Sequence, residues 1–521
     1  MRTLRKHVKI IAHLVVSGVL FMTFSSFKIF PSKSEAVSGN LKVVVLSSPK
    51  VVPSNFSGLS YELAQLKDPN FFSASNKELV KLFKILSPNG VLRLGGNSSE
   101  SCWLKVDPTT TAPQLTVPDM DTTEHWMPRE LFMIPSESID SLAGFLDATG
   151  WKLIYGFNFG HSSPERLANE ANYIAKRVQS HLLYFQIGNE PDFYSMSNNR
   201  TRPNGWGFND YIKEWTACSE QISSLIPNAK FGGPDVGSNS NWIKQFIPVA
   251  SKNLGTRLVA VTGHYYASGP PDNPNVTTAN LLKTRPDVRQ RAKDISDLAA
   301  SKNLYYRMTE GNSCYRGGKP GMSNTLASAL WGGDYMLSLA AAGCGGVNLH
   351  GGSRNMLRAA LGNHLPGEKV ATKNNETSGG YYTPIAGELE SGFEARPLFY
   401  GMLLANQFAG AEMMDVVLDV STMNVTAYAC KVNDEWRIAI FNKDLSKDLD
   451  LTIELPIPCD EVKVWRLSGR NIDATDKVSF ANSVIGSKLT WSPKSKEKCK
   501  IKNKQCLLHV PKSSAALLFL R

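Results

Sequence analysis

Three features that would place a chain in a familiar functional class are missing from this sequence of 521 residues. Its eight cysteines include no Cys-x-x-Cys pair, so the usual spacing of a zinc or dithiol site is absent. The stretch "RLGGN" (93–97) lacks the Gly-x-Gly-x-x-Gly spacing of a nucleotide-binding loop. After residue 40, no apolar run reaches the length of about 20 residues that a membrane span needs. These absences argue against a metal centre, a nucleotide-dependent enzyme and a multispanning membrane protein.

Charged residues are also not abundant, at 20% beside 42% hydrophobic residues, which is the composition of a globular protein with a large core. The net charge is +11, but the basic residues of segment 1–36 account for much of it, and the rest of the chain is near +6. Such a surplus is compatible with an anionic glycan partner and requires none. The lysine-rich stretch 495–504 is more typical of a solvated loop than of a binding groove.

Residues 1–36 differ in character from the rest of the chain. The basic "MRTLRKHVK" precedes the apolar "IIAHLVVSGVLFMTF", which has the length of a signal-peptide core. We therefore expect a signal peptide and a secreted, extracellular or lysosomal protein. The alternative is an uncleaved N-terminal anchor, which would associate the protein with a membrane.

Sequons and cysteines are consistent with the secretory route. The motif Asn-x-Ser/Thr, an acceptor for N-glycosylation, begins at Asn55, Asn199, Asn275, Asn375 and Asn424. In an oxidising compartment, Cys499 and Cys506 could close a small hairpin, although pairing cannot be read from spacing alone.

Short apolar runs alternate with helical patterns between residue 55 and about residue 400. This alternation predicts an α/β chain folded as a (β/α)8 TIM barrel. After residue 410 the pattern changes to period-two strands, which predict a C-terminal antiparallel β-sandwich. The predicted domains are a strand region at 37–54 that joins the sandwich, a catalytic barrel at 55–405 and the sandwich at 406–521. The predicted barrel strands are 56–62, 90–96, 152–158, 182–190, 229–235, 258–266, 304–311 and 345–352.

Two glutamates end predicted barrel strands. Glu190 follows the fourth run, in "YFQIGNEP", and Glu310 follows the seventh, in "YYRMTEG". The C-terminal ends of the strands carry the active site in barrels of this kind, so the two carboxylates can face each other. A pair of carboxylates suits glycoside hydrolysis, in which one group is an acid with a raised pKa and the other stays ionised.

The motifs "QIGNEP" and "MTEGNSCYRGG" resemble those of glycoside hydrolase family 79, the β-glucuronidase and heparanase family within clan A of retaining glycosidases. The stretches "GLSYE", "VLRLGGNSSESCW", "GHYY" and "GGDYMLSLAAAGCGGVNLHGG" extend the resemblance over nearly the whole barrel. The resemblance implies that Glu190 is the acid/base and Glu310 the nucleophile. Asn189 then contacts the sugar 2-hydroxyl, and Tyr266 steadies the nucleophile.

The resemblance also assigns the substrate-binding residues. Tyr315 and the backbone amides of Gly317 and Gly318 are expected to bind a glucuronate carboxylate, since glycines let backbone donors approach an anion. Arg316 either adds charge there or points to solvent. The remaining expected contacts are Glu62 with sugar hydroxyls, Asn97 at the mouth of the barrel, Tyr382 (with Tyr381 as the competing choice) near the carboxylate, and Arg93 beside a barrel carboxylate, where it would position Glu310.

These residues predict a retaining hydrolase of β-D-glucuronides, exo-acting on glycoconjugates or glycosaminoglycan-type glycans. A heparanase-like endo-enzyme is one alternative, although segment 97–151 contains no strongly charged, disposable block of the kind that animal heparanases excise. A catalytically silent glycan-binding homologue is another alternative, and a hydrolase of neutral β-glycosides is a third. No metal and no organic cofactor is expected, because two carboxylates and water suffice. The expected partner is a glucuronic-acid-containing glycan or glucuronide, not a nucleic acid.

Overall fold

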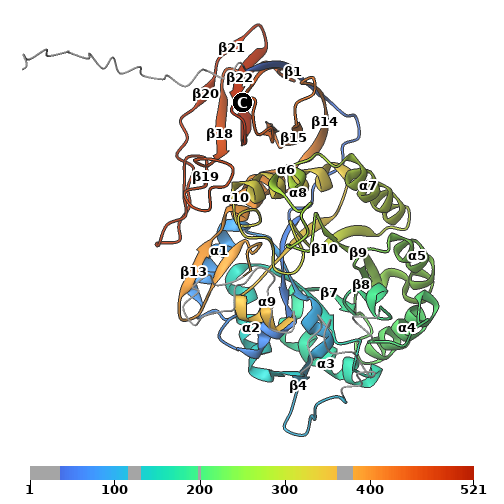
Figure 1. Ribbon diagram of the computed structural model, residues 1–521. Coiled ribbons are helices and arrows are strands. Elements are labelled where there is room, and N and C mark those ends of the chain that lie inside the picture. Colours follow the sequence, from blue (N-terminus) through green and yellow to red (C-terminus); the bar gives the residue numbers. More distant parts are fainter. Residues whose placement is uncertain (1–35, 115–130, 197–200, 361–379) are drawn as a thin grey trace, which may run out of the picture. The chain divides into compact units, whose positions relative to one another are not determined.

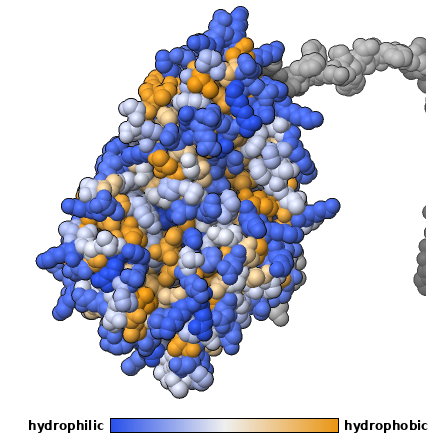
Figure 2. All heavy atoms as spheres, turned by 180° about the vertical axis from the view of Figure 1, so that it is seen from behind, coloured by the Kyte–Doolittle hydropathy of each residue, from blue (hydrophilic) through white to orange (hydrophobic). Residues whose placement is uncertain are grey.

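The computed structural model describes residues 36–114, 131–196, 201–360 and 380–521. The predicted signal or anchor segment therefore lies outside the described residues, apart from Ala36. None of the described helices is long and apolar enough to cross a membrane. Hydrophilic side chains cover most of the face in Figure 2, with apolar patches scattered between them.

The predicted TIM barrel is confirmed. Within the described residues, eight parallel strands close in the order β10-β11-β2-β3-β6-β7-β8-β9. These strands coincide with the eight apolar runs that the sequence singles out. They are β2 (Ser57–Glu62), β3 (Val91–Gly95), β6 (Lys152–Phe157), β7 (Leu182–Ile187), β8 (Phe231–Val236), β9 (Leu258–Tyr266), β10 (Tyr305–Asn312) and β11 (Gly346–Gly351).

Helices surround the barrel, one or more after each strand (Figure 1). Helix α1 (Lys77–Leu86) shows why such a segment becomes a helix. The Asn76 side chain caps it by accepting from Leu79 N–H, and leucine and phenylalanine at helical spacing face the core. The α-helices are α1 (Lys77–Leu86), α2 (Ser136–Thr149), α3 (Pro164–Val178), α4 (Phe208–Leu225), α5 (Ser240–Leu254), α6 (Thr278–Leu281), α7 (Pro286–Ala300), α8 (Leu326–Ala342), α9 (Arg354–Ala360) and α10 (Pro397–Ala405). Short 3-10 helices are η1 (Leu63–Lys67), η2 (Asn97–Ser101), η3 (Gln179–His181), η4 (Pro191–Phe193), η5 (Gly255–Arg257) and η6 (Asn406–Phe408).

The barrel interior is filled in two zones. Lower down, Val91, Ile154, Tyr184 and Ala260 form a small apolar cluster. Above it the interior becomes polar, beginning with the buried Arg93. Inward side chains alternate along each strand, and those nearest the C-terminal ends form the polar zone. This is the end at which barrels of this kind carry their active sites.

The C-terminal region forms a curled, mostly antiparallel sheet of 11 strands in the described residues. One pair differs from the predicted purely antiparallel arrangement, since β1 pairs in parallel with β17 and antiparallel with β14. The inner face buries one core of aliphatic side chains from both halves of the sheet, as in a sandwich. The strands are β1 (Val37–Val44), β14 (Glu412–Asp419), β15 (Val425–Val432), β16 (Glu435–Asn442), β17 (Leu449–Glu454), β18 (Val462–Ser468), β19 (Ser479–Phe480), β20 (Lys498–Cys499), β21 (Ile501–Lys502), β22 (Gln505–Val510) and β23 (Ser514–Leu520).

Smaller features complete the fold. Strands β4 (Cys102–Lys105) and β5 (Phe132–Pro135) pair in parallel, and β12 (Ile385–Glu388) pairs with β13 (Gly392–Ala395). Cys499 and Cys506 form a disulfide that closes the hairpin, the pairing that the sequence left open. The domain boundaries themselves stay predictions.

A buried ion pair joins barrel helix α8 to the sheet. Asp334 on α8 accepts hydrogen bonds from Thr426 and Tyr428 of β15, both at 2.6 Å. Its other oxygen lies 2.5 Å from Lys443 Nζ, whose side chain is only 1% exposed. The pair therefore neutralises a lysine that has almost no contact with water.

Replacing Asp334 with alanine should lower the free energy of unfolding by about 3–5 kcal/mol, because it removes the counter-charge of the buried Lys443 and leaves only the neutral Thr284 hydroxyl as an acceptor. Urea denaturation measures this loss. The matched control is Asp287→Ala, which breaks an exposed pair with Arg285 and should cost less than about 1 kcal/mol. Equal losses in the two variants would contradict the assigned role of the α8 pair.

Candidate active site

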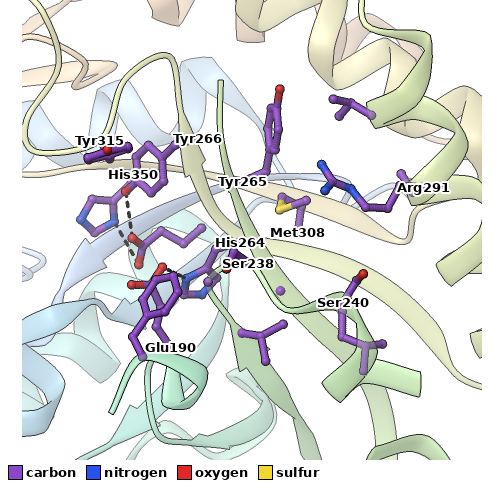
Figure 3. A pocket seen from close by; sticks show the side chains of 18 of the residues that line it. Glu190, Ser238, Ser240, His264, Tyr265, Tyr266, Arg291, Met308, Tyr315 and His350 are labelled. Carbon is purple, nitrogen blue, oxygen red and sulfur yellow. Dashed lines mark hydrogen bonds and ion pairs between the residues drawn. The ribbon is translucent and has the colours of Figure 1, made fainter. Parts of the chain in front are cut away.

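The predicted catalytic residues meet at the C-terminal end of the barrel. Glu62 ends β2, Glu190 follows β7, His264 and Tyr266 end β9, and Glu310 lies on β10. With Asn97 and other side chains they line one cavity of about 560 Å³. Figure 3 shows Glu190, His264, Tyr266, Tyr315 and His350 gathered around this end of the cavity.

Glu310 points into the barrel because strand β10 is irregular. The register between β10 and β9 shifts between Met308 and Glu310, so the period-two alternation is broken there. Thr309 faces inward and donates to Asp235 Oδ1 over 2.5 Å. The next residue, Glu310, also faces inward, where regular alternation would have turned it toward the helices.

Arg93 connects the polar side chains inside the barrel. Its guanidinium is 1% exposed and contacts Glu310 Oε2 and Asp235 Oδ2, both at 2.6 Å. The same group donates to Asn189 Oδ1 at 2.8 Å and to Gln186 and Ser60 at 3.2 Å. The expected pairing of Arg93 with a barrel carboxylate is thus present, and it holds Glu310 in place.

The surroundings of Glu310 favour its ionised form. Burial by itself would raise its pKa, but the neighbouring His350, His264 and Arg93 and a hydrogen bond lower it to about 2. That hydrogen bond comes from Tyr266, whose hydroxyl donates to Glu310 Oε1 over 2.8 Å, as the sequence suggested. Glu310 is therefore a carboxylate at neutral pH.

Glu190 has the opposite bias. Burial raises its pKa, and a hydrogen bond with His264 only partly offsets this. Its backbone is left-handed (φ 50°), and its N–H donates to the carbonyl of Asp235 over 3.0 Å. This turn before Pro191 places the carboxylate at the cavity wall, 13% exposed.

His264 and Asp235 belong to the site although the sequence did not single them out. His264 Nδ1 lies 3.0 Å from Glu190 Oε1, and its Nε2 lies 3.2 Å from Asp235 Oδ2. Burial disfavours the charged ring, but Asp235 and Glu310 raise the pKa of His264 to about 10, so it is an imidazolium. A signal existed: in "GHYY" His264 lies two residues before Tyr266 and shares its face of the strand.

Glu100 is a second residue that the sequence did not reveal. Its fully buried carboxylate accepts from Asn189 N–H at 2.8 Å and from the backbone N–H groups of Phe159 and Gly160. It thereby anchors the turn that carries Asn189 and Glu190. Only the motif "NSSES", directly after a strand, could have hinted at this role.

The expected sugar-contacting residues lie around the same cavity. Glu62 lines it and accepts from Ser98 N–H and Oγ at 2.9 and 2.7 Å. Asn97 lines it too, and accepts from Asn189 over 3.4 Å. Asn189 is buried behind this wall, and it is not among the cavity-lining residues.

Of the residues expected to bind a carboxylate, some line the cavity and others do not. Tyr315, Arg316 and Tyr382 line the cavity, with Tyr266 between the two tyrosine rings at 6.3 Å from each. Gly317 and Gly318 are buried behind them, and a Cβ on Gly318 would lie 2.7 Å from Tyr382 N. Neither glycine is among the cavity-lining residues, so their role stays a prediction. Tyr381 does not line the cavity.

The cluster of Glu190, His264 and Glu310 has a spacing that a metal ion could bridge, with one atom of each within 4.8 Å of the others. The chemistry of the histidine does not fit, because both ring nitrogens face carboxylates and the imidazolium has no free lone pair. The arrangement instead places two carboxyl groups with oppositely shifted pKa values beside each other, which suits general acid catalysis next to an ionised carboxylate.

No protein-family profile matches the chain. It is 27% identical over 403 residues to a β-glucuronidase of Aspergillus niger, covering 72% of this chain and 68% of the relative. It is 26% identical over 356 residues to a β-glucuronidase of Neurospora crassa, covering 60% of this chain and 61% of that relative.

Solved structures share the fold. A 4-O-α-L-rhamnosyl-β-D-glucuronidase of Fusarium oxysporum, in complex with Rha-GlcA, superposes with a TM-score of 0.70 at 17% identity over 92% of this chain and 100% of the other. A GH51 arabinofuranosidase of Xanthomonas axonopodis pv. citri gives a TM-score of 0.60 at 15% identity, over 93% and 100%. The likeness in fold, the two curated relatives and the paired carboxylates identify the chain as a glycosidase.

The charge of His264 should make stability depend on pH above neutrality. Because its folded-state pKa is raised from 6.5 to about 10, its contribution is complete below pH 6.5 and is lost as the pH rises toward 10. Thermal unfolding across this window should show a slope that approaches about 1.4 kcal/mol per pH unit from this group. His264→Gln should flatten the slope, whereas His509→Gln, which alters an exposed pair with Asp450, should preserve it. A wild-type slope in His264→Gln would show that the ring is not charged.

Proposed function

We propose that the protein is a retaining, exo-acting β-glucuronidase that resembles glycoside hydrolase family 79. The two curated relatives are β-glucuronidases, and the solved structure with a TM-score of 0.70 is named as an enzyme acting on a β-D-glucuronide. The motif around Glu310, "MTEGNSCYRGG", supports the same substrate class.

One observation carries the proposal: Glu190 and Glu310 face each other in opposite electrostatic environments. One oxygen of each lies within 4.8 Å of the other, close to the spacing of about 5–5.5 Å in retaining enzymes and below the roughly 6.5–9.5 Å of inverting ones. The pKa of Glu190 is raised and that of Glu310 lowered. The acid and the nucleophile are thereby distinguished before substrate binds.

In the proposed first step, ionised Glu310 attacks the anomeric carbon while protonated Glu190 gives its proton to the departing glycosidic oxygen. The aglycone leaves as an alcohol or phenol, and the sugar stays bound to Glu310 as an ester. In the second step, Glu190, now ionised, takes a proton from water as the water attacks the same carbon and releases Glu310. Two inversions give net retention, and protons balance over the cycle.

Recognition of the sugar carboxylate is assigned to the end of the cavity lined by Tyr315, Arg316 and Tyr382. Arg316 is exposed and offers a positive charge, and Tyr315 offers a hydroxyl donor. Glu62 and Asn97 then contact the sugar hydroxyls from the β2 and β3 side.

The secretory route is part of the proposal. The disulfide Cys499–Cys506 suits an oxidising compartment. Among the sequons, Asn275 is exposed, whereas the Asn424 side chain is bonded to Leu282 and Thr284. Asn199 and Asn375 lie outside the described residues.

Purified protein should release p-nitrophenol from p-nitrophenyl β-D-glucuronide, and Glu310→Gln should lower kcat by about a thousandfold or more, because the nucleophile is lost. Heparan sulfate incubated in parallel should keep its chain length, as expected for exo action. Shortened chains with the small substrate intact would favour an endo-enzyme instead.

Azide distinguishes the two carboxylates. With Glu310→Gly, azide should restore turnover and form the α-glucuronosyl azide, because the anion attacks from the vacated nucleophile side. With Glu190→Ala, it should form the β-azide by attacking the glycosyl-enzyme from the other face. The same anomer from both variants would rule out the proposed roles.

Tyr315→Phe should raise KM for p-nitrophenyl β-D-glucuronide by about tenfold or more, since a hydrogen bond to a charged group is lost. Tyr381→Phe is the same change at a tyrosine that does not line the cavity, and it should leave KM unaltered. Slow hydrolysis of p-nitrophenyl β-D-glucoside should not respond to either change. An equal effect of Tyr315→Phe on both sugars would show that it does not read the carboxylate.

A further inference from the structure

The cavity does not end at the catalytic carboxylates. It continues between the barrel wall and the helix layer, in a part that we call the outer branch, lined by Ile243, Tyr265, Val288, Ala292, Ile295 and Met308. Figure 3 shows Tyr315 and His350 at the left, Tyr265 and Met308 in the middle, and Arg291 and Ser240 at the right. The outer branch is therefore a distinct compartment of the same cavity.

The outer branch is apolar inside and open at its rim. Ile243, Ala292, Ile295 and Met308 are each no more than 4% exposed. Arg291 at the rim is exposed, and its guanidinium lies 5.8 Å from the centre of the Tyr265 ring. Small residues on facing elements preserve the space, namely Gly263 on β9 and Ala292 on α7. A Cβ on Gly263 would meet nothing closer than Ile243 Cδ1 at 3.4 Å. The side chains of α5 therefore do not press against the β9 backbone at this point.

The entrance to the outer branch lies on the side of Glu190. Val236, which ends β8, and Gly237 and Ser238, which follow it, line the cavity together with Glu190. Gly237 packs directly against Glu190, because a Cβ at this position would lie 2.8 Å from Glu190 Oε1 and 2.4 Å from the Phe193 ring, so a side chain does not fit here.

Asp192 fixes the backbone of the loop that follows β8. Its carboxylate accepts from Gly237 N–H at 2.8 Å, Ser238 N–H at 3.0 Å and Asn239 N–H at 2.9 Å. The loop after β7, which carries Glu190, is thereby joined to the loop after β8, which borders the outer branch. These hydrogen bonds fix the position of Glu190 relative to Gly237 and Ser238.

On the basis of the proposed glucuronidase activity, we propose that the outer branch is the aglycone subsite and that it takes a small apolar aglycone, of the size of a fused aromatic bicycle, rather than a second sugar. The leaving group departs on the side of the acid that protonates it, and this side opens into the outer branch. A sugar would lose the hydration of its hydroxyl groups against apolar walls, whereas an aromatic ring would gain by leaving water.

Phenyl and 2-naphthyl β-D-glucuronide test the assignment, because their leaving groups are of similar acidity and differ by one fused ring. In wild-type protein the naphthyl substrate should have the lower KM. Ala292→Phe should fill the outer branch and reduce the naphthyl-to-phenyl ratio of kcat/KM by about tenfold, mainly through KM. Ala292→Leu, a smaller change, should reduce it less and guards against a folding defect of the first variant.

Ala300→Phe is the matched control, since it introduces the same ring at an exposed position of the same helix. It should leave the ratio at its wild-type value. An unchanged ratio in both folded Ala292 variants would overturn the subsite, and so would an equal decrease in Ala300→Phe.

Direct binding separates this inference from the proposed activity. The fluorescence of 2-naphthol should change on binding to wild-type protein, and Ala292→Phe should weaken that binding. If neither glucuronide is hydrolysed but 2-naphthol binds in this way, the glucuronidase proposal fails and the apolar site stands. If glucuronides are hydrolysed while 2-naphthol does not bind and the ratio does not respond, only the aglycone subsite fails.

Discussion

The buried guanidinium of Arg93 is the constraint on which the site depends. A cation with 1% exposure must be matched by anions and hydrogen-bond acceptors, because its desolvation is otherwise too costly. Asp235 and Glu310 supply the charges, and Asn189, Gln186 and Ser60 supply the acceptors. Five other barrel positions are thus tied to one side chain of β3. Glu310 is one of them, so its position follows from the need to neutralise the arginine.

Charge and burial then distinguish the two carboxyl groups. Arg93 pairs with Asp235 and Glu310, and the ring of His264 contacts Asp235 and Glu190. A further anion there would be both desolvated and close to Glu310, which raises the pKa of Glu190. The pKa of Glu190 is thus raised, whereas Arg93, His264 and a hydrogen bond lower the pKa of Glu310. The imidazolium of His264 touches both Glu190 and Asp235, and it moderates this bias without removing it.

Irregular backbone at two strand ends connects catalysis to the shape of the cavity. The register shift in β10 turns Glu310 inward and leaves Met308 facing the helices, so adjacent parts of one strand border both compartments. A second shift, in β8 between Pro234 and Val236, accompanies the left-handed backbone of Asp235. Asp235 enters the polar interior there, while Val236 and Gly237 border the passage. Bulges of this kind re-aim side chains at the cost of regular pairing, which is why they occur beside active sites.

The sequence by itself determined the alternation of strands and helices, the barrel, the strand-rich C-terminal region and the strand-end positions of Glu190 and Glu310. Periodicity and turn chemistry are local properties, and they survive in a single chain. Only the tertiary structure decided that β1 joins the sheet in parallel with β17, that Glu310 faces inward, and that His264, Asp235 and Glu100 complete the site. Those outcomes depend on which strands become neighbours and on how buried charges are matched across the barrel. Neither is encoded in the spacing of residues along one segment.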